Sequence, residues 1–137
     1  MSAKGPRRRA REVAFKVLYQ MESRGEEGLG EGRQRLAKLR DQAYAEALVA
    51  GCRQEKGELD RIISEASKNW ALSRIPAIDK ILLRIGLYEI LYAHDIPRTV
   101  AINEAVRLAR RYGDKKSYSF VNGILDTVKR GKGEEEE

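Results

Sequence analysis

The first helical region of the sequence carries cationic and aromatic residues on the side opposite its apolar residues. At about 100° per residue, that side collects Arg8, Arg11, Phe15 and Tyr19, with Arg9 and Lys16 at its edges. Guanidinium groups pair with phosphates, and aromatic rings stack on unpaired bases. The pattern therefore predicts a surface for single-stranded nucleic acid. The alternative is that one of the rings packs inside the protein and that the arginines only keep the surface soluble.

A second group of the same kind lies near the C-terminus, in RRYGDKKSYSF (residues 110–120). Four cations alternate there with two tyrosines, namely Arg110, Arg111, Lys115 and Lys116 with Tyr112 and Tyr118. The first N–H groups of a helix that starts near Ser117 would add an anion site. Alternatively, cations at the end of the preceding helix only complement its dipole. That alternative accounts for the arginines better than for the tyrosines.

The overall charge supports a polyanionic partner. The 137 residues carry a formal net charge of +6, although the last four residues are all glutamates. A basic body of this kind is typical of proteins that bind nucleic acid. Double-stranded DNA is a less favoured target, because the interleaved aromatic residues suit unpaired strands better.

Residues suited to catalysis or to metal binding are sparse. His94 is the only histidine and lies in a predicted turn, and Cys52 is the only cysteine and falls within an apolar helical pattern. The glycines at 25–32 neither follow a strand nor end in a Lys-Ser/Thr pair, so they do not form a phosphate-binding loop. We therefore expect no enzymatic activity, no metal and no cofactor.

The elements that position these residues are all predicted to be helices. Apolar residues recur at helical spacing, and no segment alternates as a β-strand does. Helices are expected from Pro6, from about Arg33 with a new start at Asp41, around 59–66, from Pro76, around 100–112 and from Ser117. This pattern predicts an all-α bundle of six or seven helices.

The sequence also predicts which helix is central and where some helices begin and end. The helix after Pro76 is apolar around nearly its whole circumference, so we expect it to be central and buried. Gly25, Gly28, Gly30 and Gly32 are expected to end the first helix and to form a flexible loop. Gly113 is expected to end its helix in the left-handed conformation, and Ser117 to cap the last helix.

The chain length fits one domain, built from two sub-bundles at about residues 6–70 and 71–130. Residues 1–5 are expected to form a flexible basic arm, and residues 131–137 a disordered acidic tail. No apolar run is long enough to span a membrane, and no apolar segment of a secretory signal follows the basic start. A single cysteine points to the reducing cytoplasm.

Four sequence blocks, in this order, carry a resemblance to a known family. They are PRRRARE (6–12), LRIGLYE (83–89), VAINEAV (100–106) and FVNGILD (120–126). From about residue 6 to residue 130 the chain resembles the NusB family of transcription antitermination factors. The resemblance implies an all-helical protein of two packed bundles, without catalytic activity. It also implies binding to the single-stranded boxA element of nascent ribosomal RNA, together with the ribosomal protein NusE.

The resemblance further implies an assembly with other Nus factors and RNA polymerase that suppresses premature termination. Some family members form homodimers, and the sequence does not decide between a monomer and a homodimer. The alternative function is a protein-interaction module that acts mainly through NusE, with little direct RNA contact.

The resemblance also implies which residues bind each partner. The RNA-binding residues are Arg7, Arg8, Arg9, Arg11, Lys16, Tyr19, Tyr112, Lys115, Lys116, Tyr118 and Phe120. The NusE surface is expected on the helix after Pro76, at Asp79, Leu83, Arg84, Leu87 and Glu89. A helical wheel indicates that Asp79, Arg84 and Glu89 lie on the exposed side of that helix, whereas the spacing of Phe120 also fits a core position.

Overall fold

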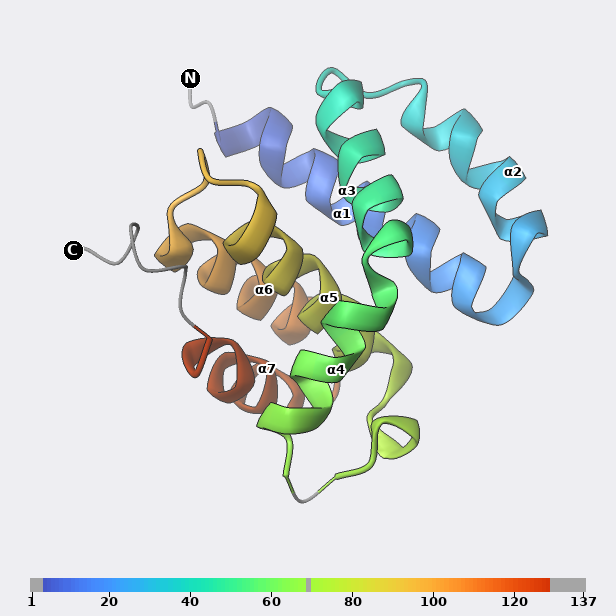
Figure 1. The fold of residues 1–137 in the computed structure, drawn as a ribbon. Helices are drawn as coiled ribbons and strands as arrows, with labels where there is room; N and C mark the ends of the chain where they lie inside the picture. Colours follow the sequence, from blue (N-terminus) through green and yellow to red (C-terminus); the bar gives the residue numbers. More distant parts are fainter. Residues whose placement is uncertain (1–3, 69, 129–137) are drawn as a thin grey trace. The chain divides into compact units, whose positions relative to one another are not determined.

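The computed structural model describes residues 4–68 and 70–128, which form seven α-helices, one short 3-10 helix and no β-strand (Figure 1). The helices are α1 (Lys4–Arg24), α2 (Glu26–Leu36), α3 (Gln42–Gln54), α4 (Lys56–Ala66), η1 (Leu72–Arg74), α5 (Ala77–Tyr92), α6 (Arg98–Tyr112) and α7 (Ser117–Asp126). The prediction of an all-α fold with six or seven helices is confirmed. Helix α1 already includes the last two residues of the predicted arm, whereas residues 1–3 and the predicted tail at 131–137 lie outside the described residues.

The chain divides into two compact units, Met1–Gln54 and Glu55–Glu137. The boundary lies earlier in the chain than the division between sub-bundles expected at about residue 70. The reason is that α4 packs against α5 and therefore belongs to the second unit. None of the helices in the described ranges is long and apolar enough to cross a membrane.

In the first unit, α1 packs against both α2 and α3. The prediction of a flexible loop at Gly25–Gly32 is wrong, because only Gly25 leaves the helical conformation, with φ at 64°. Gly28 and Gly32 face α1 at close range. A Cβ atom would lie 2.8 Å from the carbonyl carbon of Gln20 if added at Gly28, and 2.6 Å from Cγ1 of Val17 if added at Gly32. The glycines thus allow α1 and α2 to approach closely.

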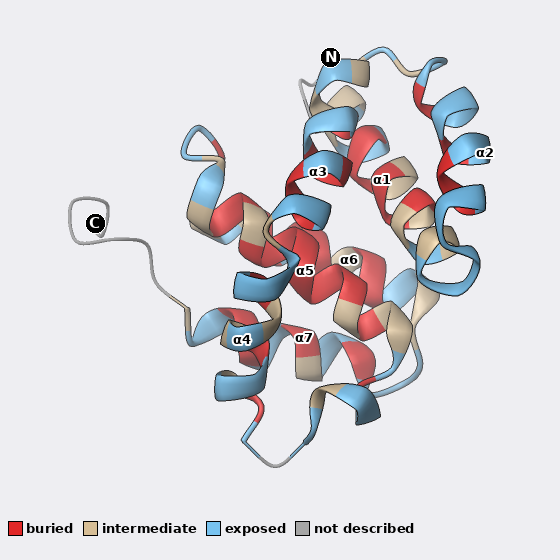
Figure 2. Cartoon of the chain, turned by 45° about the vertical axis from the view of Figure 1, so that its right-hand side comes forward, coloured by how far each residue is buried: buried red, intermediate tan, exposed pale blue. Residues whose placement is uncertain are grey.

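In the second unit, α5 is the central helix, as predicted. It packs against α4, α6 and α7, and Figure 2 shows it buried along most of its length. Gly86 allows close contact with α7, since a Cβ atom there would lie 2.7 Å from Cδ1 of Leu125. Arg84 also ties α5 to α4 through two hydrogen bonds to the Asp60 carboxylate, at 2.8 and 3.0 Å.

The turn between α6 and α7 differs from its prediction. Gly113 has φ −90° and ψ −172°, so the left-handed cap is wrong. Glycine is needed there for space, because a Cβ atom would meet the Ser117 side chain and would lie 2.8 Å from the Ala109 carbonyl oxygen. Ser117 is the first residue of α7 rather than its cap. Instead, the Asp114 carboxylate accepts a hydrogen bond from the Lys116 N–H at 2.8 Å.

Two alanine substitutions in α2 test the close packing on α1. Gly32→Ala forces a methyl group against Val17, and we expect it to destabilise the protein by about 1–3 kcal/mol. Gly30→Ala is the matched control, since nothing lies within 4 Å of its added Cβ atom. The control should stabilise the protein by about 0.5–1 kcal/mol through helix propensity. Urea unfolding measures both, and equal effects of the two substitutions would contradict the packing.

Candidate nucleic-acid interface

The arginines at the start of α1 point in different directions. Arg8 and Arg9 are exposed, Arg7 is half-buried and Arg11 is buried. Nε of Arg7 lies 3.2 Å from Oδ2 of Asp41, and its guanidinium lies 4.0 Å from the centre of the Tyr44 ring. Arg11 also lies over that ring, at 5.9 Å. Two of the predicted RNA-binding arginines therefore hold α1 against the start of α3.

The two aromatic residues of α1 also separate. Phe15 is only 3% exposed and belongs to the core, whereas Tyr19 is 41% exposed. Their ring centres lie 6.2 Å apart. The interpretation of Phe15 as part of an exposed aromatic stripe is wrong, because the polar side of this helix is narrower than the wheel suggests. Tyr19 retains the exposure that base stacking requires.

A groove of about 770 Å³ lies between the start of α1 and the end of α2 with the residues that follow it. We call it the basic groove, and its lining residues are Gly5, Pro6, Arg9, Val13, Lys16, Arg35, Lys38, Leu39 and Arg40. Five of these residues are cations, and none is a carboxylate. Val13 and Leu39 give the groove an apolar part. Such a surface binds the phosphates of a strand while leaving room for its bases and sugars.

Of the residues that line this groove, only Arg9 and Lys16 were predicted from the sequence as RNA-binding residues. Arg35, Lys38 and Arg40 were missed as site residues, although the cation-rich run RQRLAKLR (33–40) was visible. The run was interpreted only as the start of a helix. Because α2 was not expected upstream of it, nothing placed these cations beside α1.

The second predicted group lies at the end of α6 and the start of α7. The Arg110 guanidinium lies 4.1 Å from the centre of the Tyr118 ring, and Arg111 lies 5.5 Å from that of Tyr112. Tyr118 is exposed and Tyr112 is half-buried. Cations stacked on tyrosines at these distances hold the rings in place, so this surface combines positive charge with positioned aromatic faces.

The remaining members of the second group follow the Gly113 turn. Lys115 and Lys116 are exposed, and Phe120 is half-buried. Phe120 lines a pocket together with Lys116. The structure brings Lys116 and Phe120 together within the second unit, and it leaves Phe120 partly outside the core.

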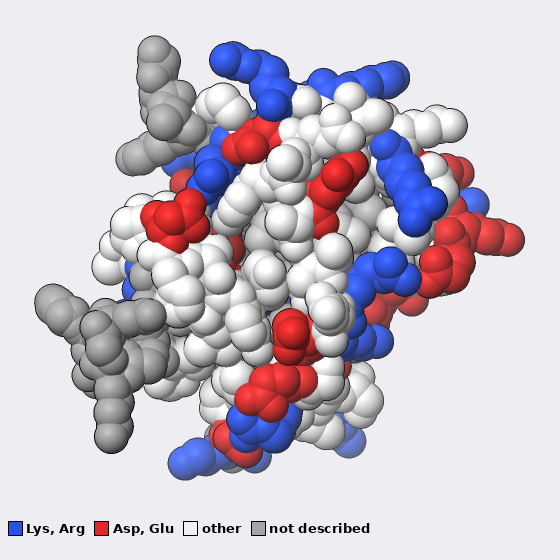
Figure 3. Space-filling view, turned by 45° about the horizontal axis from the view of Figure 1, so that its top comes forward, with Lys and Arg blue, Asp and Glu red and all other residues white. Residues whose placement is uncertain are grey.

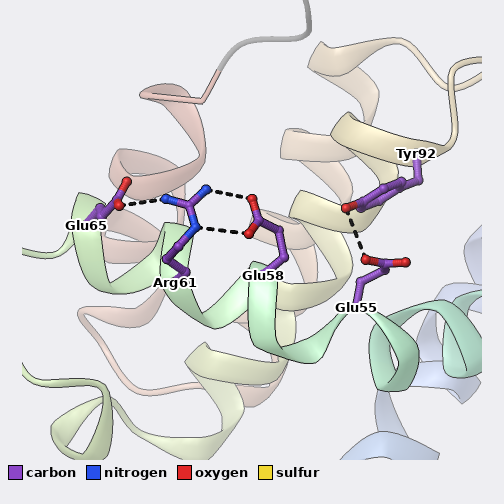
Figure 4. A network of polar contacts seen from close by, with 5 residues as sticks. All are labelled: Glu55, Glu58, Arg61, Glu65 and Tyr92. Atoms are coloured by element: carbon purple, nitrogen blue, oxygen red, sulfur yellow. Dashed lines mark hydrogen bonds and ion pairs between the residues drawn. The ribbon is translucent and has the colours of Figure 1, made fainter.

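Several exposed cations outside the basic groove are paired with carboxylates. Figure 3 shows Lys and Arg side chains projecting from several places on one face, with Asp and Glu side chains beside many of them. On α4, Arg61 bonds Glu58 at 2.6 and 3.0 Å and Glu65 at 2.6 Å (Figure 4). These ion pairs lower the pKa of Glu58 and raise that of Arg61. The basic groove differs from this surface in having no carboxylate in its lining.

Near this network, the Tyr92 hydroxyl donates a hydrogen bond to Oε1 of Glu55 at 3.3 Å (Figure 4). Partial burial, followed by the Glu55 charge, raises the pKa of Tyr92. Among the described residues, no group of three or more His, Cys, Asp or Glu side chains could hold a metal ion.

Comparison with known proteins identifies the family. The sequence profile of the NusB family matches residues 8–130. The chain belongs to the NusB family. This confirms the resemblance found in the four sequence blocks, and the family consists of transcription antitermination factors, which are not enzymes.

Individual relatives agree with this assignment. The transcription antitermination protein NusB of Trichlorobacter lovleyi is 43% identical over 130 residues, covering 90% of this chain and 90% of that protein. The NusB of Acetivibrio thermocellus is 43% identical over 126 residues, covering 89% of this chain and 87% of that protein. The solved structure of T. maritima NusB superposes with a TM-score of 0.80 at 37% identity, covering 88% of each chain.

A further solved structure is described as "Crystal Structure of Antitermination Factors NusB and NusE in complex with dsRNA". Its matching chain is 29% identical, with a TM-score of 0.78, and the match covers 89% of this chain and 94% of that one. That structure shows a similar protein together with NusE and RNA.

The NusE-facing residues expected from the NusB family lie in the interior. Asp79, Leu83, Arg84, Leu87 and Glu89 are all buried. The prediction from the helical wheel that α5 has an exposed polar side is therefore wrong. Its polar residues have internal roles, as the Arg84–Asp60 ion pair shows, and the apolar residues around the whole circumference of the helix already indicated burial.

Burial changes the chemistry of one of these residues. Desolvation raises the pKa of the Asp79 carboxyl, the nearby Asp114 charge raises it further, and a hydrogen bond with the Ser117 side chain lowers it. Since the folded-state pKa lies above the unfolded one, folding favours the protonated form. The stability contributed by protonation is fully present below the unfolded pKa and is lost as pH rises through the folded pKa.

The raised pKa can be measured directly by ¹³C NMR of the side-chain carboxyl. We expect Asp79 to titrate above the ordinary value of about 3.9 for Asp. Ser117→Ala should raise the pKa further, because it removes a hydrogen bond that favours the ionised form. A midpoint below the ordinary value, or a downward shift in Ser117→Ala, would contradict the assigned environment.

Proposed function

We propose that this chain binds boxA-type single-stranded RNA of nascent ribosomal transcripts together with NusE, and thereby suppresses premature transcription termination. The observation that carries the proposal is the basic groove, with five cations and no carboxylate in its lining. A polyanion removes the mutual repulsion of these cations and releases condensed counterions on binding. Membership of an antitermination family supplies the biological setting.

The exposed tyrosines support an unpaired strand as the ligand. Tyr19 in the first unit and Tyr118 in the second unit present rings at the surface. Bases in a duplex are stacked on one another, whereas single-stranded bases can stack on such rings. The related complex contains double-stranded RNA, so strandedness has to be tested for this chain.

NusE is the proposed protein partner, because a similar protein was crystallised with it. We extend the proposal to the larger assembly with other Nus factors and RNA polymerase, and to a cytoplasmic location, since nascent ribosomal RNA is made there. The buried side chains of α5 are not part of the proposed NusE surface.

The proposal is tested by fluorescence anisotropy with a labelled boxA-type strand, a scrambled strand and a boxA duplex, with and without NusE. The groove variant carries Arg35→Ala, Lys38→Ala and Arg40→Ala. The control variant carries Lys56→Ala, Arg61→Ala and Lys68→Ala, which removes the same formal charge from exposed positions of the second unit. Circular dichroism checks that both variants are folded.

We expect the native chain to prefer the boxA strand and to bind it more tightly with NusE. The groove variant should lose about tenfold or more in affinity, and its log–log salt slope should fall by about 2, at about 0.7 per lost phosphate contact. The control variant should change much less. Equal losses of RNA affinity in both variants would reject the groove as the binding site. A native chain that supports antitermination but has no measurable RNA affinity would favour a module that acts through NusE alone.

A further inference from the structure

The second unit contains a pocket of about 410 Å³ that is separate from the basic groove. It lies between the segment before α5, the start of α5 and the residues that begin α7. We call it the Trp70 pocket, and the lining residues that matter here are Trp70, Arg74, Asp79, Asp114, Lys116 and Phe120. Its volume is in the range of pockets that take small organic ligands.

Trp70 is exposed although its backbone is fixed. Its N–H donates to the Ser67 carbonyl at 2.9 Å, and the buried Ser67 hydroxyl bonds the Ile63 carbonyl at 2.7 Å, which anchors the segment to the end of α4. The residue nevertheless remains 53% exposed. Large aromatic side chains held at the surface beside a pocket are typical of binding sites. With the half-buried Phe120, Trp70 gives the pocket two aromatic lining residues.

Asp79 supplies a buried hydrogen-bond acceptor to the pocket. The residue is 4% exposed, and its Oδ1 atom has no hydrogen-bond partner within the described parts of the chain. The other carboxylate of the pocket, Asp114, already accepts a hydrogen bond from the Lys116 N–H. Buried polar atoms without partners are uncommon in native proteins. A hydrogen bond with the Ser117 side chain already involves the Asp79 carboxyl, so its Oδ1 atom is the acceptor left for a ligand that donates hydrogen bonds.

The charges of the pocket are arranged by depth. Arg74 and Lys116 are exposed, whereas Asp79 is buried. A ligand that fits this arrangement has a flat apolar body, hydrogen-bond donors on its inner edge and a negative group on its outer side. A nucleotide has all three, with its phosphate near the cations and its base between the aromatic side chains.

We propose that the Trp70 pocket holds one unstacked nucleobase of the bound RNA and that Asp79 selects guanine. Guanine is the base whose Watson–Crick edge presents two adjacent donors, N1–H and N2–H, which can both point to the single acceptor Oδ1 of Asp79. Uracil places carbonyl oxygens on both sides of its single N–H, and adenine and cytosine place a ring-nitrogen acceptor beside the amino group. This inference rests on the proposed RNA-binding function and adds base selection to it.

The only tryptophan of the chain provides the first readout. Trp70 fluorescence is followed during titration with GMP, AMP, CMP and UMP, with free N-acetyltryptophanamide as the correction for absorption by the nucleotides. We expect GMP to quench Trp70 at about tenfold lower concentration than the other nucleotides, as expected for one well-placed pair of hydrogen bonds.

Three variants assign the effect to the pocket. Asp79→Asn keeps the shape of the side chain but replaces one acceptor by a donor, so the guanine preference should disappear. Phe120→Leu keeps an apolar wall but removes the ring, so quenching by all four nucleotides should weaken. Asp126→Asn, on the exposed end of α7, is the matched control and should keep the preference. Thermal unfolding checks that each variant is folded.

A second arm separates this proposal from the proposed function. Labelled boxA-type RNA is compared with the same strand in which each guanine is replaced by inosine, which lacks the N2 amino group. A native chain that binds both strands equally and shows no nucleotide preference overturns the pocket proposal, while RNA binding through the basic groove stands. Loss of RNA binding together with an Asp79-dependent GMP preference has the opposite meaning, because the proposed function then fails and the pocket remains a nucleotide site.

Discussion

The close approach of α1 and α2 is the constraint on which the candidate interface depends. Gly28 and Gly32 lie four residues apart, so both fall on the same face of α2. On that face Gly28 lies against the backbone of Gln20, and Gly32 lies against the side chain of Val17. This packing sets the path of the chain at the end of α2, and with it the positions of Arg35, Lys38 and Arg40. The basic groove is therefore a consequence of helix packing as much as of local charge.

Bringing five cations to one groove costs electrostatic free energy in the isolated protein. Some cations outside the groove lining are paired with carboxylates. Arg7 is held by Asp41 and the Tyr44 ring, and Arg61 is held between two glutamates. The cations of the groove lining have no carboxylate among them, so a polyanionic strand is the ligand that best relieves their repulsion. The proposed binding of RNA therefore follows from the charge distribution of the groove.

Much of the fold could be predicted from the sequence, because the strongest signals are local. Proline marks the starts of α5 and α6, and the apolar circumference of α5 indicated a central helix. Helix α2 could not be predicted, since glycine has low helix propensity and the benefit of Gly28 and Gly32 comes only from α1. The reason for glycine at position 113 could not be predicted either, because glycine is needed there to leave space for Ser117 and not to allow a left-handed backbone.

The site was predictable in kind but not in detail. Arginines with aromatic residues drew attention to the starts of α1 and α7, and RNA binding at both places stays a prediction. A helical wheel, however, cannot show which polar residues a neighbouring helix covers. Arg11 and Phe15 were therefore placed on the exposed side, and so were Asp79, Arg84 and Glu89. Trp70 was not predicted as a site residue, because its pocket also needs Asp114, Lys116 and Phe120 from far along the chain.

The central claim is that the basic groove holds the RNA strand, and lysine acetylation with mass spectrometry tests it most directly. Lys16 and Lys38 line the groove, whereas Lys56 and Lys68 are exposed in the second unit. With boxA-type RNA bound, acetylation should slow at Lys16 and Lys38 and stay unchanged at Lys56 and Lys68. Unchanged acetylation of Lys38 in a saturated complex would contradict the claim.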